Sequence, residues 1–398
     1  MKIDHIETAH LCFQYPAGFA YAGGTCTARL TSLVFVHTDD GRCGMGSVYS
    51  HPGLVELVVK HQLEPFLIGR DPTEVEELWS LMYGLTRWFG RKGAAMSAVG
   101  GIDTALWDLR GQVAEKPIWQ LLQGERKTCP AYASALLWQD VDPLTEEAGQ
   151  LIDAGFRRVK MRLARNPEYD AAAIRGVRQA IGPQCDMMVD GSMRYDLPAA
   201  RYIAKLLDEA GAFWFEEPFA PEDLDTFAQL RQETSVPLAA GENEFGAQGF
   251  RELVRTGSVD IVQPDASRCG GISEVRRAAE LAQSANLQVA THSWSDALAI
   301  VANAHVMAAI PNGLTVEVDC TNNPFVKELL SEPLMIRDGE LQLPTAPGLG
   351  VTLRPEVIDR YRLQNPLDVA DGAYSDMVFG PQHYDPAAPY DSQSLPIS

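Results

Sequence analysis

Short apolar runs alternate with amphipathic stretches through the middle of the chain. The runs end on polar residues and lie at 158–162, 187–190, 213–217, 237–242, 261–265, 289–292 and 314–317. Between them, segments such as 199–207 and 273–285 carry apolar residues with a helical period. Repeated strand–helix alternation predicts a parallel sheet, and this many units closes best into a barrel. In such barrels the chemistry sits at the carboxyl ends of the strands, where this sequence places its carboxylates, a Lys and a His.

The first part of the chain has a different pattern, which predicts an α+β domain. A β-rich run at 29–37 leads into a hairpin turn signal, and helical periodicity follows at 72–83 and 96–122. In the second helix, apolar residues line one face, while Asp103 and Asp108 lie off it.

The chain therefore divides into three predicted segments. Residues 1–125 form the α+β domain, and residues 126–324 form the barrel. Residues 325–398 return to short strand and turn signals, and we expect them to rejoin the first domain. The end of this segment, after Asn365, is rich in Pro, Asp, Ser and Tyr and is a candidate for packing on a neighbouring subunit.

Composition restricts the partners of this protein. The formal net charge is -20 over 398 residues, which argues against a nucleic-acid or membrane-surface partner. No apolar run has the length of a membrane span. The 7 Cys are widely spaced without a CxxC pair and no signal peptide is visible, so we expect reduced thiols in a cytoplasmic enzyme. An anionic substrate needs locally concentrated positive charge on such an acidic protein.

Asp190, Glu216 and Glu242 end three successive predicted strands. Adjacent parallel strands lie about 4.8 Å apart, so the three carboxylates can converge on one point. Unpaired, they would repel one another, and a hard divalent cation relieves that repulsion. Oxygen-only ligands favour Mg²⁺ or Mn²⁺. A surface acid beside a loop is an equal alternative for any one of them, but three at matching positions favour a metal site.

Asp265 and His292 end the next two strands. A carboxylate beside an imidazole holds one tautomer and makes a competent general acid/base, although a lone His is more often structural. Lys160 and Arg162 share one side of their strand, opposite His292, because strand side chains alternate. Either can simply neutralise a substrate carboxylate, and Arg162 is a poor base.

These residues resemble the enolase superfamily, in its mandelate racemase subgroup, over residues 1 to about 360. The motifs are Gly101-Ile102-Asp103-Thr104-Ala105-Leu106-Trp107-Asp108, Lys160-x-Arg162, Phe215-Glu216-Glu217-Pro218, Gly241-Glu242-Asn243, Pro264-Asp265, Cys269-Gly270-Gly271 and Thr291-His292. The resemblance implies an α/β fold in which an α+β N-terminal capping domain, completed by C-terminal residues, covers a (β/α)7β barrel. It also implies abstraction of the proton α to a carboxylate, giving an enediolate held by Mg²⁺, and a homo-oligomer.

The resemblance assigns roles residue by residue. It makes the three strand-end carboxylates the metal ligands, Asp265–His292 the acid/base dyad and Glu317 a hydrogen-bond donor to the substrate carboxylate. Many subgroup members carry a second Lys base where Arg162 stands here, which puts two-base racemisation in doubt. Ser192 occupies a position that is often Asn, so contacts to the substrate carboxylate can differ.

The predicted capping loops should set specificity. Residues 15–26, with small residues near Tyr21, and residues 47–53, with Tyr49 and His51, are the candidates. Glycine-rich lids suit closure over a small polar ligand. Ser192 and Trp294 are further candidate substrate contacts.

The leading hypothesis is a Mg²⁺-dependent dehydratase of an acid sugar (an aldonate or aldarate) that gives a 2-keto-3-deoxy acid. One alternative is an isomerase acting on a 2-hydroxy acid or sugar lactone: a racemase, epimerase or cycloisomerase. Another is a catalytically silent binding homologue, which the complete triad and dyad disfavour. The sequence alone does not name the sugar.

Overall fold

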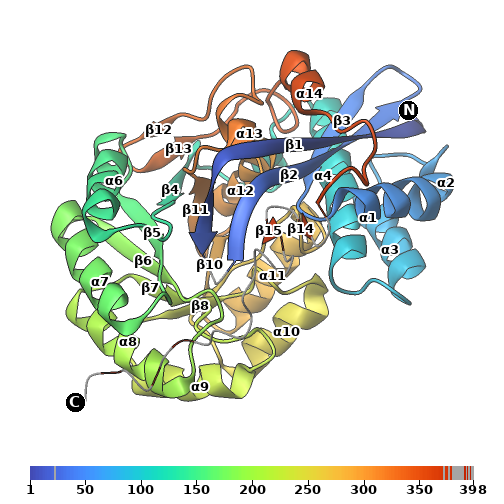
Figure 1. The fold of residues 1–398 in the computed structure, drawn as a ribbon. Coiled ribbons are helices and arrows are strands. Elements are labelled where there is room, and N and C mark those ends of the chain that lie inside the picture. The colour runs from blue at the N-terminus through green and yellow to red at the C-terminus, as the bar shows by residue number, and fades with distance from the viewer. Residues whose placement is uncertain are drawn as a thin grey trace.

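The computed structural model describes residues 1–21, 24–370, 373–374 and 377–378, together with residues 390, 392 and 395. Strands β4 to β11 form a closed parallel barrel, since β11 pairs with β4. Figure 1 shows helices α6 to α12 as a ring around these strands. The predicted alternation of strands and helices is confirmed, and so is the (β/α)7β order.

The barrel elements in chain order are β4 (Thr128–Ser134), α6 (Val141–Asp153), β5 (Arg158–Arg162), α7 (Pro167–Ile181), β6 (Asp186–Asp190), α8 (Leu197–Glu209), β7 (Trp214–Glu216), α9 (Leu224–Glu233), β8 (Leu238–Ala240), α10 (Gly246–Thr256), β9 (Ile261–Val262), α11 (Ile272–Ser284), β10 (Gln288–Thr291), α12 (Ala297–Ala309) and β11 (Gly313–Asp319). Inward-facing side chains fill the barrel. A separate apolar cluster there consists of Tyr132, Met188, Trp214, Ala239, Ile261 and Ala290.

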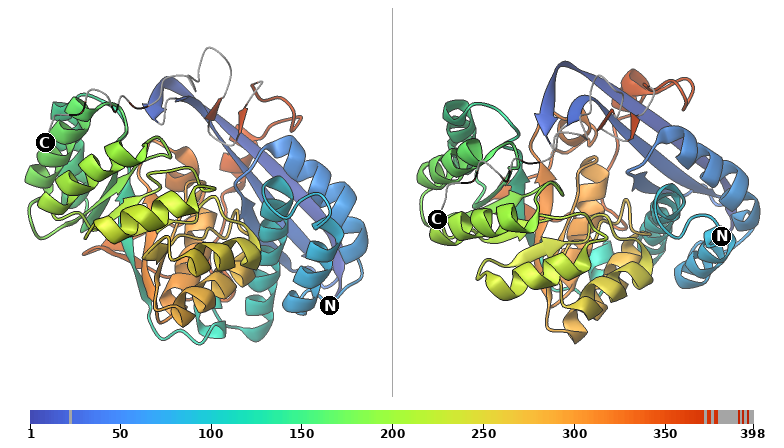
Figure 2. Two further views of the ribbon diagram at one scale, coloured as in Figure 1. Left: turned by 90° about the horizontal axis from the view of Figure 1, so that it is seen from below. Right: turned by 60° about the horizontal axis from the view of Figure 1, so that its bottom comes forward.

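An antiparallel sheet and a set of helices form the N-terminal capping domain. Its elements are β1 (Ile3–Tyr21), β2 (Gly24–Thr38), β3 (Cys43–Val48), α1 (Pro52–Leu57), the π-helical segment η1 (Val58–Leu63), α2 (Glu64–Leu67), α3 (Val75–Thr86), α4 (Ala94–Ala114) and α5 (Ile118–Leu121). Figure 2 shows this domain beside the barrel, with the β1–β2 hairpin reaching across the barrel end. At the hairpin tip, Ala20 forms a β-bridge with Trp138, which follows β4.

The C-terminal segment contacts both parts of the molecule. It contains α13 (Pro324–Lys327), β12 (Ile336–Arg337), β13 (Glu340–Gln342), α14 (Pro355–Tyr361), β14 (Ala373–Tyr374) and β15 (Met377–Val378). β13 pairs with barrel strand β4, whereas β15 pairs with β2 and so extends the capping sheet. C-terminal residues therefore complete the capping domain, as expected, while the domain boundaries at residues 125 and 324 stay predictions.

Most of the C-terminal tail lies outside the described residues, so its contact with another subunit stays a prediction. Tyr390 is described, and its ring lies 4.7 Å from that of Tyr195 in the barrel. No helix within the described ranges is long and apolar enough to cross a membrane.

The structure corrects two expectations about the capping domain. Residues 15–21 and 24–26, the described part of this stretch, are not a loop: they belong to β1 and β2, with Phe19 paired to Cys26 and Tyr21 to Gly24. The strands approach closely there, since a Cβ on Gly18 would lie 2.8 Å from the Cys26 carbonyl oxygen. Small residues in this stretch therefore indicate close strand packing rather than a mobile lid.

The long helix α4 ends at Ala114 instead of residue 122, because Glu115 is left-handed (φ 53°) and Pro117 cannot continue a helix. Asp103 and Asp108, which lie off the apolar face of this helix, are both buried. Asp103 accepts hydrogen bonds from the Ser273 backbone N and Oγ at 2.9 and 2.7 Å, and burial raises its pKa to about 7. These bonds join the capping helix to the barrel.

Candidate active site

Three carboxylates converge at the carboxyl ends of β6, β7 and β8. Asp190 and Glu216 are the last residues of their strands and are directly paired in register, and Glu242 follows β8 by two residues. Their ligand oxygens all lie within 4.8 Å of one another. Gly241 has φ 135°, and a Cβ there would lie 2.9 Å from the Gln263 backbone N. Only glycine fits this turn, which brings Glu242 back to the other two.

This triad has the donor set of a hard divalent cation. The Asp190 and Glu216 side chains are almost fully buried, and burial raises the pKa of Glu216 to about 7. The buried Glu242 Oε2 makes no hydrogen bond to any described residue. Buried carboxylates crowded in this way need positive charge. Three carboxylate ligands without nitrogen or sulfur fit Mg²⁺ or Mn²⁺.

Lys160 and Arg162 on β5 supply fixed positive charge beside the triad. Lys160 Nζ lies 2.5 Å from Glu216 Oε1 and 2.9 Å from Glu317 Oε1. Burial lowers the pKa of Lys160, but the two glutamates outweigh it and raise that pKa above its usual range. Arg162 pairs in register with Asp190 and forms an ion pair with its carboxylate. Neither cation is therefore poised to accept a proton.

His292 and Asp265 form a dyad on the other side of the triad. His292 Nδ1 donates to Asp265 Oδ2 at 2.8 Å, because the carboxylate can only accept. His292 Nε2 then lies 3.5 Å from Glu242 Oε2 and 3.9 Å from Glu317 Oε2. Burial lowers the pKa of His292, but Glu242, Glu317 and Asp265 raise it to about 9. A cation bound to Glu242 would cancel part of that negative charge and make His292 easier to deprotonate.

Two buried side chains that the sequence did not reveal hold the dyad. Asp265 Oδ1 accepts from the Ser267 backbone N and Oγ, each at 2.8 Å, and from Asn303 Nδ2 at 3.0 Å. Asn303 Nδ2 also donates to the His292 carbonyl oxygen at 3.1 Å. Asn303 is a buried amide on the apolar helix α12, where His305 is the other polar residue, and a polar residue in such a helix is the signal that could have indicated it.

Glu317 on β11 lies between Lys160 and His292. Its Oε2 accepts from the Ser293 backbone N at 2.7 Å. Burial raises the pKa of Glu317, but Lys160 and His292 outweigh this and hold it below its usual range. Glu317 therefore accepts a hydrogen bond in this structure, and its role as a donor to the substrate carboxylate stays a prediction.

The predicted specificity residues have varied surroundings. Ser192 donates to Asp190 Oδ1 from its backbone N at 2.6 Å and from Oγ at 3.2 Å, so it positions a triad carboxylate. His51 accepts from the Gly53 backbone N at 3.1 Å and caps α1. The Tyr21 side chain lies outside the described part of the structure.

Tyr49 and Trp294 are buried aromatic residues at the site. The Tyr49 ring centroid lies 6.1 Å from that of His292. The Trp294 ring lies under two guanidinium groups, that of Arg29 at 4.8 Å and that of Arg162 at 5.1 Å. Trp294 therefore links the capping domain, which contributes Arg29, to the cation beside the triad.

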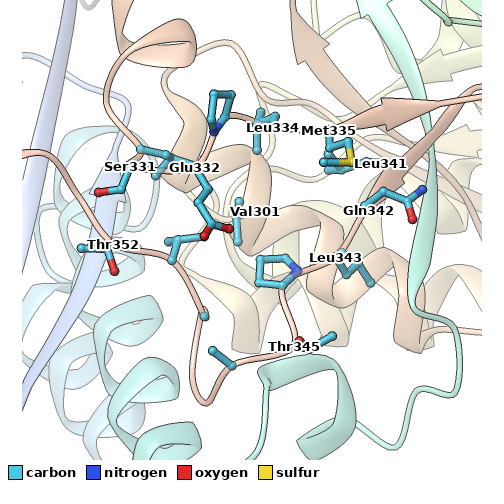
Figure 3. A pocket seen from close by; sticks show the side chains of 16 residues that line it. Val301, Ser331, Glu332, Leu334, Met335, Leu341, Gln342, Leu343, Thr345 and Thr352 are labelled. Atoms are coloured by element: carbon cyan, nitrogen blue, oxygen red, sulfur yellow. The ribbon is translucent and has the colours of Figure 1, made fainter.

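A cavity of about 680 Å³ lies elsewhere, between α12 and the segment around β12 and β13. Figure 3 shows it lined by side chains such as Leu334, Met335 and Leu343. No triad or dyad residue lines it. Convergent charge, rather than size, therefore identifies the candidate active site.

Comparison with known proteins identifies the family of this chain. Residues 6–123 match the "Mandelate racemase / muconate lactonizing enzyme, N-terminal domain" model, and residues 143–357 match "Enolase C-terminal domain-like". The chain belongs to the mandelate racemase and muconate lactonizing enzyme family of the enolase superfamily. The resemblance seen in the sequence is thereby confirmed.

Relatives of this chain include a cycloisomerase and dehydratases. D-galactarolactone cycloisomerase of Agrobacterium fabrum is 33% identical, covering 92% of this chain and 100% of the relative. Arabinonate dehydratase of Saccharolobus solfataricus is 32% identical, covering 83% of this chain and 90% of the relative. The solved structure of L-talarate dehydratase of Polaromonas sp. JS666, complexed with Mg and L-glucarate, is 28% identical with a TM-score of 0.81. The match covers 91% of this chain and 98% of that protein.

Proposed function

We propose that this chain is a Mg²⁺-dependent dehydratase that converts an acid sugar, an aldonate or aldarate, to a 2-keto-3-deoxy acid. The observation that carries the proposal is the His292–Asp265 dyad, whose free Nε2 faces the carboxylate triad at 3.5 Å from Glu242. Relatives named as dehydratases and the Mg-bound talarate dehydratase support it. Asp190, Glu216 and Glu242 would hold the cation, which supplies positive charge to stabilise the substrate carboxylate.

In this proposal His292 moves the protons. Nε2 removes the α-proton, and the electron pair of the C–H bond passes into the carboxylate as an enediolate. The electrons then return to form the Cα–Cβ double bond, the β C–O bond breaks, and protonated His292 gives its proton to the departing hydroxide. Water leaves, and the enol product tautomerises to the 2-keto acid. Asp265 holds the imidazole tautomer throughout.

Lys160 and Arg162 would act as fixed charges on the opposite face. Lys160 is paired with Glu216 and Glu317, and Arg162 is paired with Asp190. These ion pairs hold both cations beside the triad, where negative charge would develop on the substrate. Arg162 presents a planar fork that suits a carboxylate. This arrangement favours proton removal from one face only, and therefore disfavours racemisation and epimerisation.

Lactone cycloisomerisation is the second candidate, because the D-galactarolactone cycloisomerase matches over its whole length. A cycloisomerase can begin with the same α-proton removal and expel a ring oxygen instead of a hydroxyl. The shared first step means that the dyad serves either reaction. A small anionic substrate and a homo-oligomeric state remain part of the proposal.

An acid-sugar and sugar-lactone library incubated with Mg²⁺ tests the proposal. A dehydratase produces a 2-keto acid from an open-chain acid, and a cycloisomerase converts a lactone without forming water. Exchange of the α-proton in D₂O should occur for one α-epimer only. Comparable exchange of both α-epimers would contradict the one-base mechanism, and no exchange or product with any member would contradict the enzyme assignment.

A further inference from the structure

Glu217 is a fourth buried acid beside the triad that the proposed mechanism does not use. Glu217 is the residue directly after Glu216, and its backbone is left-handed (φ 35°). Oε2 accepts from Asn243 Nδ2 at 2.8 Å. Oε1 is buried and has no hydrogen-bond partner among the residues that the structure describes. A buried acceptor without a donor is destabilising, so this oxygen needs a partner.

The position of Glu217 is adjacent to the triad without being part of it. Its oxygens do not belong to the group that lies within 4.8 Å. Glu217 is joined to the triad on two sides, because Glu216 precedes it in the chain and its hydrogen-bond partner Asn243 directly follows Glu242.

Asn243 and Arg268 fix the orientation of Glu217. Arg268 Nη2 donates to Asn243 Oδ1 at 3.0 Å, which leaves the Asn243 amide NH2 group to donate to Glu217. The Arg268 guanidinium lies 5.1 Å from the Tyr49 ring centroid and 5.7 Å from that of Phe245. This chain of contacts runs from the capping domain, which contributes Tyr49, to the edge of the triad.

We propose that Glu217 is an outer-sphere residue of the divalent-cation site and that Arg268 is a positioning residue acting on it through Asn243. The inference rests on the proposed assignment of the triad as the cation ligands. Mg²⁺ keeps several of its waters in proteins, and a cation-bound water is the donor that Glu217 Oε1 lacks. Residues that hold ligands in this way typically change metal affinity by 10- to 100-fold.

Calorimetric titration of the full-length, EDTA-treated protein with Mg²⁺, without substrate, tests this. Glu217→Gln keeps the shape, but its amide oxygen stays with the Asn243 donor and an NH2 group replaces the acceptor Oε1, so binding should weaken by about 10- to 100-fold. Arg268→Met should also weaken it, because Asn243 loses its anchor. If Arg268 acts through Glu217, the double variant should bind no more weakly than Glu217→Gln, within about twofold.

Glu244→Gln is the matched control, since Glu244 lies on the same loop as Asn243 but pairs with Lys92 at 2.8 Å. Its affinity should stay within about threefold of wild type, as expected for an acid with its own counter-ion. If Glu217→Gln does not fold, Asn243→Ser replaces it, because that change removes the contacts to both Glu217 and Arg268.

Wild-type Mg²⁺ affinity in folded Glu217→Gln, or in Asn243→Ser used in its place, overturns the inference. It is also overturned if the loss of Mg²⁺ affinity in the double variant equals the product of the losses in Glu217→Gln and Arg268→Met. Asp190→Asn separates this failure from failure of the triad assignment. If Asp190→Asn weakens Mg²⁺ binding and Glu217→Gln does not, only the outer-sphere inference fails. If Asp190→Asn binds Mg²⁺ normally, the triad assignment fails first.

Discussion

Replacing Asp265 by Asn should move the proton of His292 to the wrong nitrogen. Among the described residues, Asp265 Oδ1 accepts three hydrogen bonds, two from Ser267 and one from Asn303, whereas Oδ2 accepts only from His292 Nδ1. In Asp265→Asn the one remaining oxygen stays with the three donors, so the new NH2 group faces Nδ1. An NH2 group donates, Nδ1 must accept, and the proton of the neutral imidazole then sits on Nε2. Nε2 can no longer remove the α-proton.

The expected loss in kcat is about 10⁴-fold, or about 5 kcal/mol in activation free energy. That is the size of the tautomer effect when the Asp of a Ser–His–Asp triad becomes Asn. Ser267→Ala is the matched control, because it removes one donor to Oδ1 but keeps the carboxylate and the tautomer. A hydrogen bond to a charged group contributes about 1.5–3 kcal/mol, so this control should lose at most about 150-fold, well short of the loss in Asp265→Asn.

The assay measures initial rates at saturating substrate, together with Mg²⁺ affinity and thermal stability of each variant. Asp265→Asn should keep its fold and its Mg²⁺ affinity while turnover disappears. A kcat within about tenfold of wild type would refute the tautomer argument. A loss of Mg²⁺ binding as large as the loss in kcat would show that the change acts through the triad instead.

Three further changes separate metal binding, pH dependence and stability. Glu216→Gln should weaken Mg²⁺ binding at least about tenfold by calorimetry, because a neutral amide replaces a charged ligand. His305→Gln should reduce acid sensitivity: burial lowers the pKa of His305 from 6.5 to about 4, so its stabilisation is complete above 6.5 and is lost as the pH falls toward 4. Between about pH 7.5 and about pH 5 the free energy of unfolding in urea should drop in both proteins. The drop in His305→Gln should be smaller than the drop in wild type by about 2 kcal/mol. Arg29→Met should lower that free energy at neutral pH by about 3–5 kcal/mol, because it leaves buried Asp319 without its partner at 3.1 Å.

Each of these changes has a result that would contradict it. Unchanged Mg²⁺ affinity in Glu216→Gln would remove this residue from the ligand set. Equal acid sensitivity in His305→Gln and wild type would mean that His305 is not held neutral by burial. The double change of Arg29 to Met and Asp319 to Asn should recover part of the lost stability, and no recovery would place the effect of Arg29 elsewhere.

The barrel and the convergence of the triad followed from local pattern. Each strand is short, ends on a polar residue and recurs after one helix, and parallel pairing then places the strand ends at one edge. The register bears this out, since Arg162, Asp190 and Glu216 are aligned across β5, β6 and β7. Sequence alone sufficed here because strand period and strand order are nearly local properties.

Other features depend on contacts between distant segments, which a single sequence does not contain. Asp103 belongs to the capping domain by its position, but its partner is Ser273 in the barrel, 170 residues away. Asn303 and Ser267 support Asp265 from different elements. The β1–β2 hairpin was misinterpreted because small residues such as Gly18 serve flexible loops and closely packed strands equally well.

The charges at the site explain why cation and substrate binding should depend on each other. Around the triad the described acidic side chains are Asp190, Glu216, Glu217, Glu242, Asp265 and Glu317, against Lys160, Arg162 and His292. If all were ionised, the acids would exceed the bases by three charges; the neighbouring acids add to the burial that raises the pKa of Glu216, and at His292 they outweigh the burial that lowers it. An anionic substrate entering such a site would meet net repulsion. A divalent cation removes most of that excess, so ordered binding, with the cation before the substrate, follows from the same residues that would carry out the chemistry.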